Sequence, residues 1–155
     1  SMDMIEKLSI IISLLTALVA VWNSWFTIKS FNETRKYDVK KMRYEKLYDY
    51  YMEYISRKEK LNYLSPTDTI NTLNYIFSVY ENIKFLMDKE ISDKLNILQN
   101  NLEKERNQFL SDFDRMNLDE RNRSLEELIQ ASKSFNGEFK KYYQLQLSKD
   151  YNKLV

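Results

Sequence analysis

The feature that most constrains this chain is a run of 21 consecutive residues without a formal charge, Leu8 to Ile28, in a sequence where 30% of residues are charged. A helix rises about 1.5 Å per residue, so the run would be about 31 Å long, close to the ~30 Å hydrocarbon thickness of a bilayer. Trp22, Trp25 and Phe26 near its C-terminal end are typical of aromatic residues at a membrane interface. The run therefore predicts an N-terminal membrane-spanning helix within residues 1–28.

Two other interpretations of this run are weaker. A secretory signal sequence would have basic residues ahead of the run and a small-residue cleavage site behind it. Here Asp3, Glu6 and Lys7 precede the run, and an aromatic stretch ends it. A buried or interfacial helix is the second alternative, because the run contains several polar side chains.

Basic residues follow the run directly. Within residues 29–47 they are Lys29, Arg35, Lys36, Lys40, Lys41, Arg43 and Lys46, whereas Lys7 alone precedes the run. Because positive charge favours the cytoplasmic side of a span, we expect the N-terminus outside and residues 29–155 in the cytoplasm. The juxtamembrane basic side chains are also expected to lie against anionic lipid headgroups.

Composition favours an all-α fold. Glycine and proline occur once each, as Gly137 and Pro66, whereas β-rich folds need many tight turns. The prediction is a single transmembrane helix that continues into a cytosolic bundle of about four helices. Cysteine and histidine are absent, which excludes disulfides, the usual zinc ligands and every imidazole base. We therefore expect no enzyme, no cofactor and no metal, and the net charge of +1 gives no nucleic-acid footprint.

Apolar residues recur at steps of three and four, the pattern of helices with one buried face. The first such pattern continues from the uncharged run to Leu64, either as one rod or with a hinge at residues 30–34. Pro66 excludes the helical conformation for the residue before it and so ends this helix. Thr67 or Asp68 is expected to cap a second helix.

The remaining helices have weaker boundary signals. The second helix is expected to end near Met87, and Ser92 or Asp93 is expected to cap a third. A polar turn at residues 117–123 leads to a last helix. Its end is expected to fray after Ser148, as chain termini commonly do.

Six small or polar residues lie at spacings of 4, 3, 4, 3 and 4 within the uncharged run: Ser9, Ser13, Thr16, Ala20, Asn23 and Thr27. Lipid does not reward a polar helix face, so this stripe should face another helix or water. A single span has to find that helix on another copy or another protein. We predict a homo-oligomer in which the stripe is either a close-packed seam between copies or the lining of a pore.

Arg106 falls on the apolar seam of the predicted third helix. One interpretation is a snorkelling arginine that pairs with Glu103 or Glu105. The other is that Arg106 and Asn107, followed by three residues and Ser111, resemble the Arg-polar-xxx-His motif of HEPN ribonucleases, small helical bundles that dimerise to cut RNA. Serine replaces the essential histidine, so cleavage by that mechanism is not available to this chain.

The layout and the degenerate motif together resemble the small membrane-anchored accessory proteins of type VI-B CRISPR systems, which are encoded beside an RNA-guided RNA nuclease. The matching features are the span at Leu8–Ile28 and the pair Arg106 and Asn107. The resemblance implies a homo-oligomeric pore in the bacterial inner membrane that depolarises it in antiviral defence, with the nuclease or its RNA products as partners. The alternative function is a membrane-tethered binding or scaffold module that recruits a cytosolic partner without forming a pore.

Overall fold

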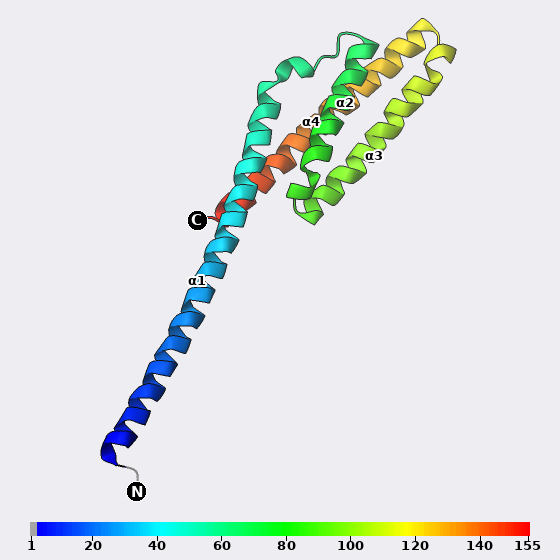
Figure 1. Cartoon of the computed structure of the whole chain (residues 1–155). Coiled ribbons are helices and arrows are strands. Elements are labelled where there is room, and N and C mark those ends of the chain that lie inside the picture. The colour runs from blue at the N-terminus through cyan, green and yellow to red at the C-terminus, as the bar shows by residue number, and fades with distance from the viewer. Residues whose placement is uncertain (1–2) are drawn as a thin grey trace. The chain divides into compact units, whose positions relative to one another are not determined.

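The computed structural model describes residues 3–155, of which no residue is in a strand, and 91% of the chain is helical. Four α-helices follow in chain order (Figure 1): α1 Met4–Ser56, α2 Pro66–Ile83, α3 Lys89–Asp112 and α4 Leu118–Asn152. Single 3-10 turns lie between them at Lys58–Lys60, Lys84–Leu86 and Phe113–Arg115. The all-α fold and the number of helices are confirmed, and α1 is helical through residues 30–34 without a hinge.

The chain divides into two compact units, Ser1–Met42 and Arg43–Val155. Every side chain that the structure describes in the first unit is exposed, whereas burial begins with Leu47 in the second. The boundary expected at residue 28 marks where charged residues begin. The structural boundary lies further along α1, where side chains begin to pack into a core.

Aromatic rings form the centre of the bundle. The ring of Phe139, in α4, lies 5.3 Å from that of Tyr54, 6.1 Å from that of Tyr80 and 5.6 Å from that of Tyr143. All three contacts are edge-to-face, an arrangement that adds to the free energy of apolar burial. The rings of α1 and α2 are thereby fixed on α4, and α3 packs along α4 beside them.

Helix α1 ends at Ser56, earlier than the Leu64 that the apolar pattern predicted. The reason lies in the hydroxyl of Thr72 in α2, which is buried. It accepts a hydrogen bond from the Asn62 amide at 2.9 Å and donates to the carbonyl oxygens of Asn62 at 2.6 Å and Lys60 at 3.2 Å. These bonds satisfy backbone groups that a longer helix would otherwise have paired.

The cap of helix α2 lies two or three residues before the positions that the sequence indicated. Ser65 is the capping residue, and its hydroxyl accepts a hydrogen bond from the Asp68 amide at 3.0 Å. Pro66 takes the first helical position, where its missing N–H costs nothing. The expected caps, Thr67 and Asp68, therefore lie inside the helix.

Helix α3 also starts earlier than predicted, at Lys89 rather than after Ser92 or Asp93. The residue that precedes it, Asp88, is held by α4. Its backbone amide donates a hydrogen bond of 2.8 Å to the buried side-chain oxygen of Gln146. A partner from a distant part of the chain thus sets this boundary.

Helix α4 is longer than predicted at both ends. It begins at Leu118, inside the polar stretch assigned to a turn, because Asn117 and Glu120 bond reciprocally at 2.9 Å. It continues to Asn152 instead of fraying after Ser148. The last turn is retained because the side chain of Asp150 is buried.

Buried tyrosines make the bundle sensitive to alkali, Tyr54 and Tyr143 most strongly. Burial raises the pKa of Tyr54 and Tyr143 well above the ordinary value, and neighbouring tyrosines raise it further. The unfolded chain ionises near pH 10, so stability should be constant below that pH and fall by about 1.4 kcal/mol per pH unit for each tyrosine above it. Urea unfolding followed by circular dichroism between pH 7 and 11 (about one unit past the unfolded pKa) measures this slope.

Matched variants isolate the buried ring. Tyr143→Phe should reduce the alkaline slope and, because the hydroxyl donates to the Leu47 carbonyl at 2.7 Å, should cost about 1 kcal/mol at neutral pH. Tyr37→Phe, in the exposed part of α1, should change neither quantity. An unchanged slope in Tyr143→Phe would contradict the burial argument.

Candidate functional site

The N-terminal part of α1 is the one segment of the described chain long and apolar enough to cross a membrane, by length and composition. None of its apolar window is buried. Covering a leucine-sized side chain is worth about 1.5–3 kcal/mol, so an exposed surface of this kind favours association with lipid or protein. The same exposure distinguishes it from the core helix of a soluble protein, which would be mostly buried.

The six-residue stripe from Ser9 to Thr27 lies on one face of this segment. At about 100° per residue, its members fall within an arc of about 80°. Two of its hydroxyls are satisfied by their own helix: Thr16 donates to the Ile12 carbonyl at 2.9 Å, and Thr27 donates to the Asn23 carbonyl at 2.8 Å. The side-chain amide of Asn23 has no hydrogen-bond partner within residues 3–155, so it is the group in the stripe that most needs one from outside.

The basic flank is exposed as well. Lys29, Arg35, Lys36, Lys40 and Lys41 all lie on α1 with their side chains in contact with solvent. The Lys29 ammonium lies 5.1 Å from the centre of the Trp25 ring, a cation–π contact. That ring in turn lies 5.5 Å from the ring of Trp22.

Arg43 was counted with the basic flank, but the structure assigns it to the bundle. Its Nη2 lies 3.2 Å from Asp88 Oδ1, and its Nε donates to the Leu86 carbonyl at 2.8 Å. Its Nε also lies 3.7 Å from Asp150 Oδ2, on a side chain that is 6% exposed. Sequence reasoning missed this cluster because the partners lie far along the chain.

The charge of this cluster is balanced within the bundle. Partial burial alone would raise the pKa of the Asp88 carboxyl, but contact with Gln146 and the positive charges of Lys153 and Arg43 lower it. Asp150 Oδ1 accepts a hydrogen bond of 3.1 Å from the side-chain amide of Gln146. The cluster therefore fastens helices together and offers no free acid or base.

Arg106 is half-buried and points to α2. Its Nη1 donates to Asn74 Oδ1 at 2.7 Å, and its guanidinium lies 5.3 Å from the centre of the Phe77 ring. The expected ion pair with Glu103 or Glu105 is therefore not the contact that the structure gives. An amide and an aromatic ring on the neighbouring helix take that place.

The rest of the HEPN-like motif is at the surface. Asn107 and Ser111 are exposed, and Asn107 Oδ1 accepts long hydrogen bonds of 3.4 Å from Arg106. With its arginine directed at α2 and no histidine in the chain, the motif supplies no acid–base pair for cutting RNA.

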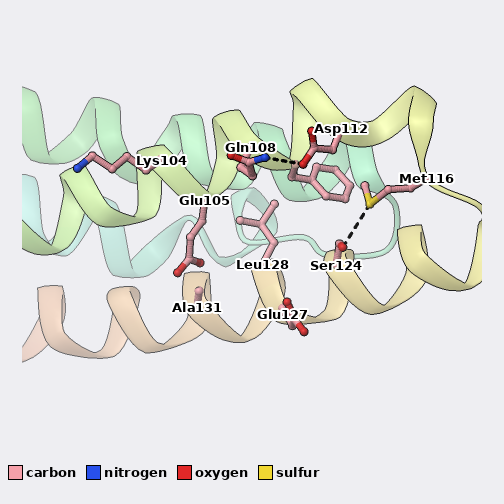
Figure 2. Close-up of a pocket in the computed structure, with 10 residues that line it drawn as sticks. Lys104, Glu105, Gln108, Asp112, Met116, Ser124, Glu127, Leu128 and Ala131 are labelled. Carbon is pink, nitrogen blue, oxygen red and sulfur yellow. Dashed lines mark hydrogen bonds between the residues drawn. The ribbon is translucent and has the colours of Figure 1, made fainter.

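A groove of about 520 Å³ lies between α3 and α4 (Figure 2). Two pairs of its lining residues bond to each other: Gln108 donates to Asp112 at 2.5 Å, and the Ser124 hydroxyl donates to the Met116 sulfur at 3.4 Å. No cluster of three carboxylates fit to hold a metal occurs in the part of the chain that the structure describes. The groove can receive a partner but carries no activated nucleophile.

The features described above differ in whether their partners lie inside the bundle. The Arg43 cluster and Arg106 have their partners inside the bundle, whereas the apolar face of α1 and its stripe require a covering from outside it. The N-terminal part of α1 is therefore the candidate functional site. Comparison with family models, with curated protein sequences and with solved structures finds no match in any of the three.

Proposed function

We propose that this protein is a single-pass membrane protein whose copies associate through α1 and form an ion-conducting pore. The observation that carries the proposal is the small and polar stripe within residues 8–28, a segment whose other side chains, except Ser24, are apolar. In lipid, the Asn23 amide needs a hydrogen-bond partner from another helix or from pore water. An interhelical hydrogen bond of this kind contributes about 1 kcal/mol.

The opposite face of the helix supports the same arrangement. Trp22 and Trp25 lie across the helix from the stripe, so a ring of copies with the stripe inward would place these rings against lipid. Indole rings favour the level of the lipid headgroups. The basic flank then lies in the cytoplasm with the bundle, and the N-terminus lies outside. The resemblance to CRISPR accessory proteins supports a role in which the pore depolarises a bacterial inner membrane during antiviral defence.

The double variant Thr16→Leu/Asn23→Leu should strongly reduce ion flux. Two leucines would fill the stripe with apolar volume and remove its strongest hydrogen-bonding group. We expect potassium efflux from loaded liposomes to fall at least about tenfold, the effect of losing roughly 1.4 kcal/mol of association or conduction free energy. A potassium electrode measures the flux, and circular dichroism checks that the bundle stays folded.

The matched control adds the same kind of volume beside the stripe. Ala17→Leu/Val21→Leu should leave potassium efflux close to that of the unchanged protein. Equal efflux in the stripe variant and in this control would contradict the pore, as would a monomeric or dimeric mass in detergent.

The groove between α3 and α4 favours a second candidate function, a tethered binding module. Here α1 is only an anchor, and the bundle recruits a cytosolic partner. Exchanging residues 8–28 for an unrelated apolar helix of equal length separates the two functions. Depolarisation of cells that express the protein should disappear if α1 forms a pore, whereas recruitment by the bundle should survive the exchange.

A further inference from the structure

A second face of α1, opposite the stripe, combines indole rings and lysines. Its members, here called the lysine ridge, are spaced 3, 4, 7 and 4 residues apart: Trp22, Trp25, Lys29, Lys36 and Lys40. At about 100° per residue they lie within an arc of about 60°. The ridge therefore runs straight along the helix from the end of the uncharged run into the basic flank.

The rings of Trp22 and Trp25 set the depth of the ridge relative to the lipid headgroups. Indole rings favour the headgroup level, and the Lys29 ammonium already lies 5.1 Å from the Trp25 ring. Along the helix, Lys36 lies about 10 Å beyond Lys29, and Lys40 lies about 16 Å beyond Lys29. Long lysine side chains reach back toward the interface, so a helix that leans toward this face brings all three ammonium groups to lipid phosphates.

The ridge lysines form no salt bridge in the part of the chain that the structure describes. Within residues 3–155, no carboxylate oxygen lies within 4.0 Å of the ammonium groups of Lys29, Lys36 or Lys40. The next basic position along the same face, Arg43, is instead held by Asp88 at 3.2 Å and Asp150 at 3.7 Å. The part of the face that is free to bind an anion therefore ends at Lys40.

We propose that the lysine ridge binds the phosphate groups of anionic phospholipids in the cytosolic leaflet, so that α1 leans with this face toward the bilayer surface. The proposal rests on the membrane span of the proposed function but not on the pore. The occupant is lipid because the ridge is continuous with the indole pair, which belongs at the interface. Each lysine at the headgroups should favour an anionic over a zwitterionic lipid by about fivefold.

Spin labels can compare the two faces, because the chain has no cysteine of its own. Asn32→Cys places a nitroxide beside the ridge, and Thr34→Cys places one on the stripe side at almost the same depth. The full chain is reconstituted in phosphatidylcholine vesicles with or without phosphatidylglycerol. Power-saturation EPR then measures collision of each label with a water-soluble nickel complex.

With phosphatidylglycerol present, the label at residue 32 should be at least about twofold less accessible to nickel than the label at residue 34. In phosphatidylcholine alone the two labels should be equally accessible. Lys29→Gln/Lys36→Gln/Lys40→Gln should abolish the difference. The control Arg35→Gln/Lys41→Gln/Lys46→Gln removes the same charge from other faces and should preserve it.

Two failures are distinguishable. Equal accessibility of both labels in vesicles that contain phosphatidylglycerol, or the same loss in both triple variants, would overturn the ridge alone. Failure of the unlabelled chain to float with phosphatidylcholine vesicles would overturn the membrane span and the ridge together.

Discussion

Replacing Phe139 with alanine should lower the free energy of unfolding of the bundle by about 4 kcal/mol, the usual cost of deleting a large buried ring. Phe139 is fully buried, and its ring contacts Tyr54, Tyr80 and Tyr143 from three directions. Because these rings come from three helices, no small local shift can refill the cavity. Urea unfolding in detergent, followed by the helical circular-dichroism signal, measures the loss.

The control for this variant is Phe85→Ala, which removes a ring that is 69% exposed. It should change the free energy of unfolding by no more than about 0.5 kcal/mol. If both phenylalanine variants unfolded at the same urea concentration, Phe139 would not be the centre of the core.

Replacing Arg43 with methionine should cost about 3 kcal/mol, because it leaves a buried carboxylate without the positive charge that compensates it. The group left behind is the Asp150 carboxylate, whose Oδ2 has the Arg43 guanidinium 3.7 Å away and no hydrogen-bond donor. Lys46→Met, an exposed change of the same charge on the same helix, should have little effect. Urea unfolding compares the two.

A second substitution tests where that loss originates. Arg43→Met/Asp150→Leu removes both charges, and apolar replacement of a whole buried pair is often neutral. The double variant should therefore regain most of the stability lost by Arg43→Met. A double variant as unstable as the single one would show that Asp150 is not the source of the loss.

The sequence was sufficient for the class of fold and for the buried faces of α2, α3 and α4, whereas Val39 and Met42 of the α1 pattern are exposed. Steps of three and four apolar residues are a local property, so residues that the structure buries, such as Leu95, Phe109 and Phe139, can be placed on the apolar faces of their helices from spacing alone. The scarcity of glycine and proline argued against β-rich folds. Both signals depend on residues within one or two turns of each other.

Helix ends were predicted less well, because distant groups set them. Thr72 ends α1 early by bonding the backbone at Asn62, and Gln146 holds the residue before α3. The ion pair expected for Arg106 was wrong for the same reason, because its actual partner, Asn74, lies on another helix. No periodicity within a window reveals such partners.

In the candidate site too, features set by local spacing could be predicted, whereas contacts with distant residues could not. The stripe and the basic flank follow from spacing alone, because α1 is helical throughout. The engagement of Arg43 with Asp88 and Asp150 could not be predicted, because it depends on the packing of α1 against the start of α3 and the end of α4. A run of basic residues on one helix therefore contained one member that serves the fold.

The positions of the two tryptophans allow the two units of the chain to be followed separately by intrinsic fluorescence. Trp22 and Trp25 are its only indoles, and both lie in the first unit. Emission excited at the red edge of the absorption band therefore reports on the environment of that part of α1 alone. The tyrosines of the bundle, including Tyr54 and Tyr143, contribute only at shorter excitation wavelengths. Membrane entry and folding of the bundle can thus be followed separately in the unlabelled protein.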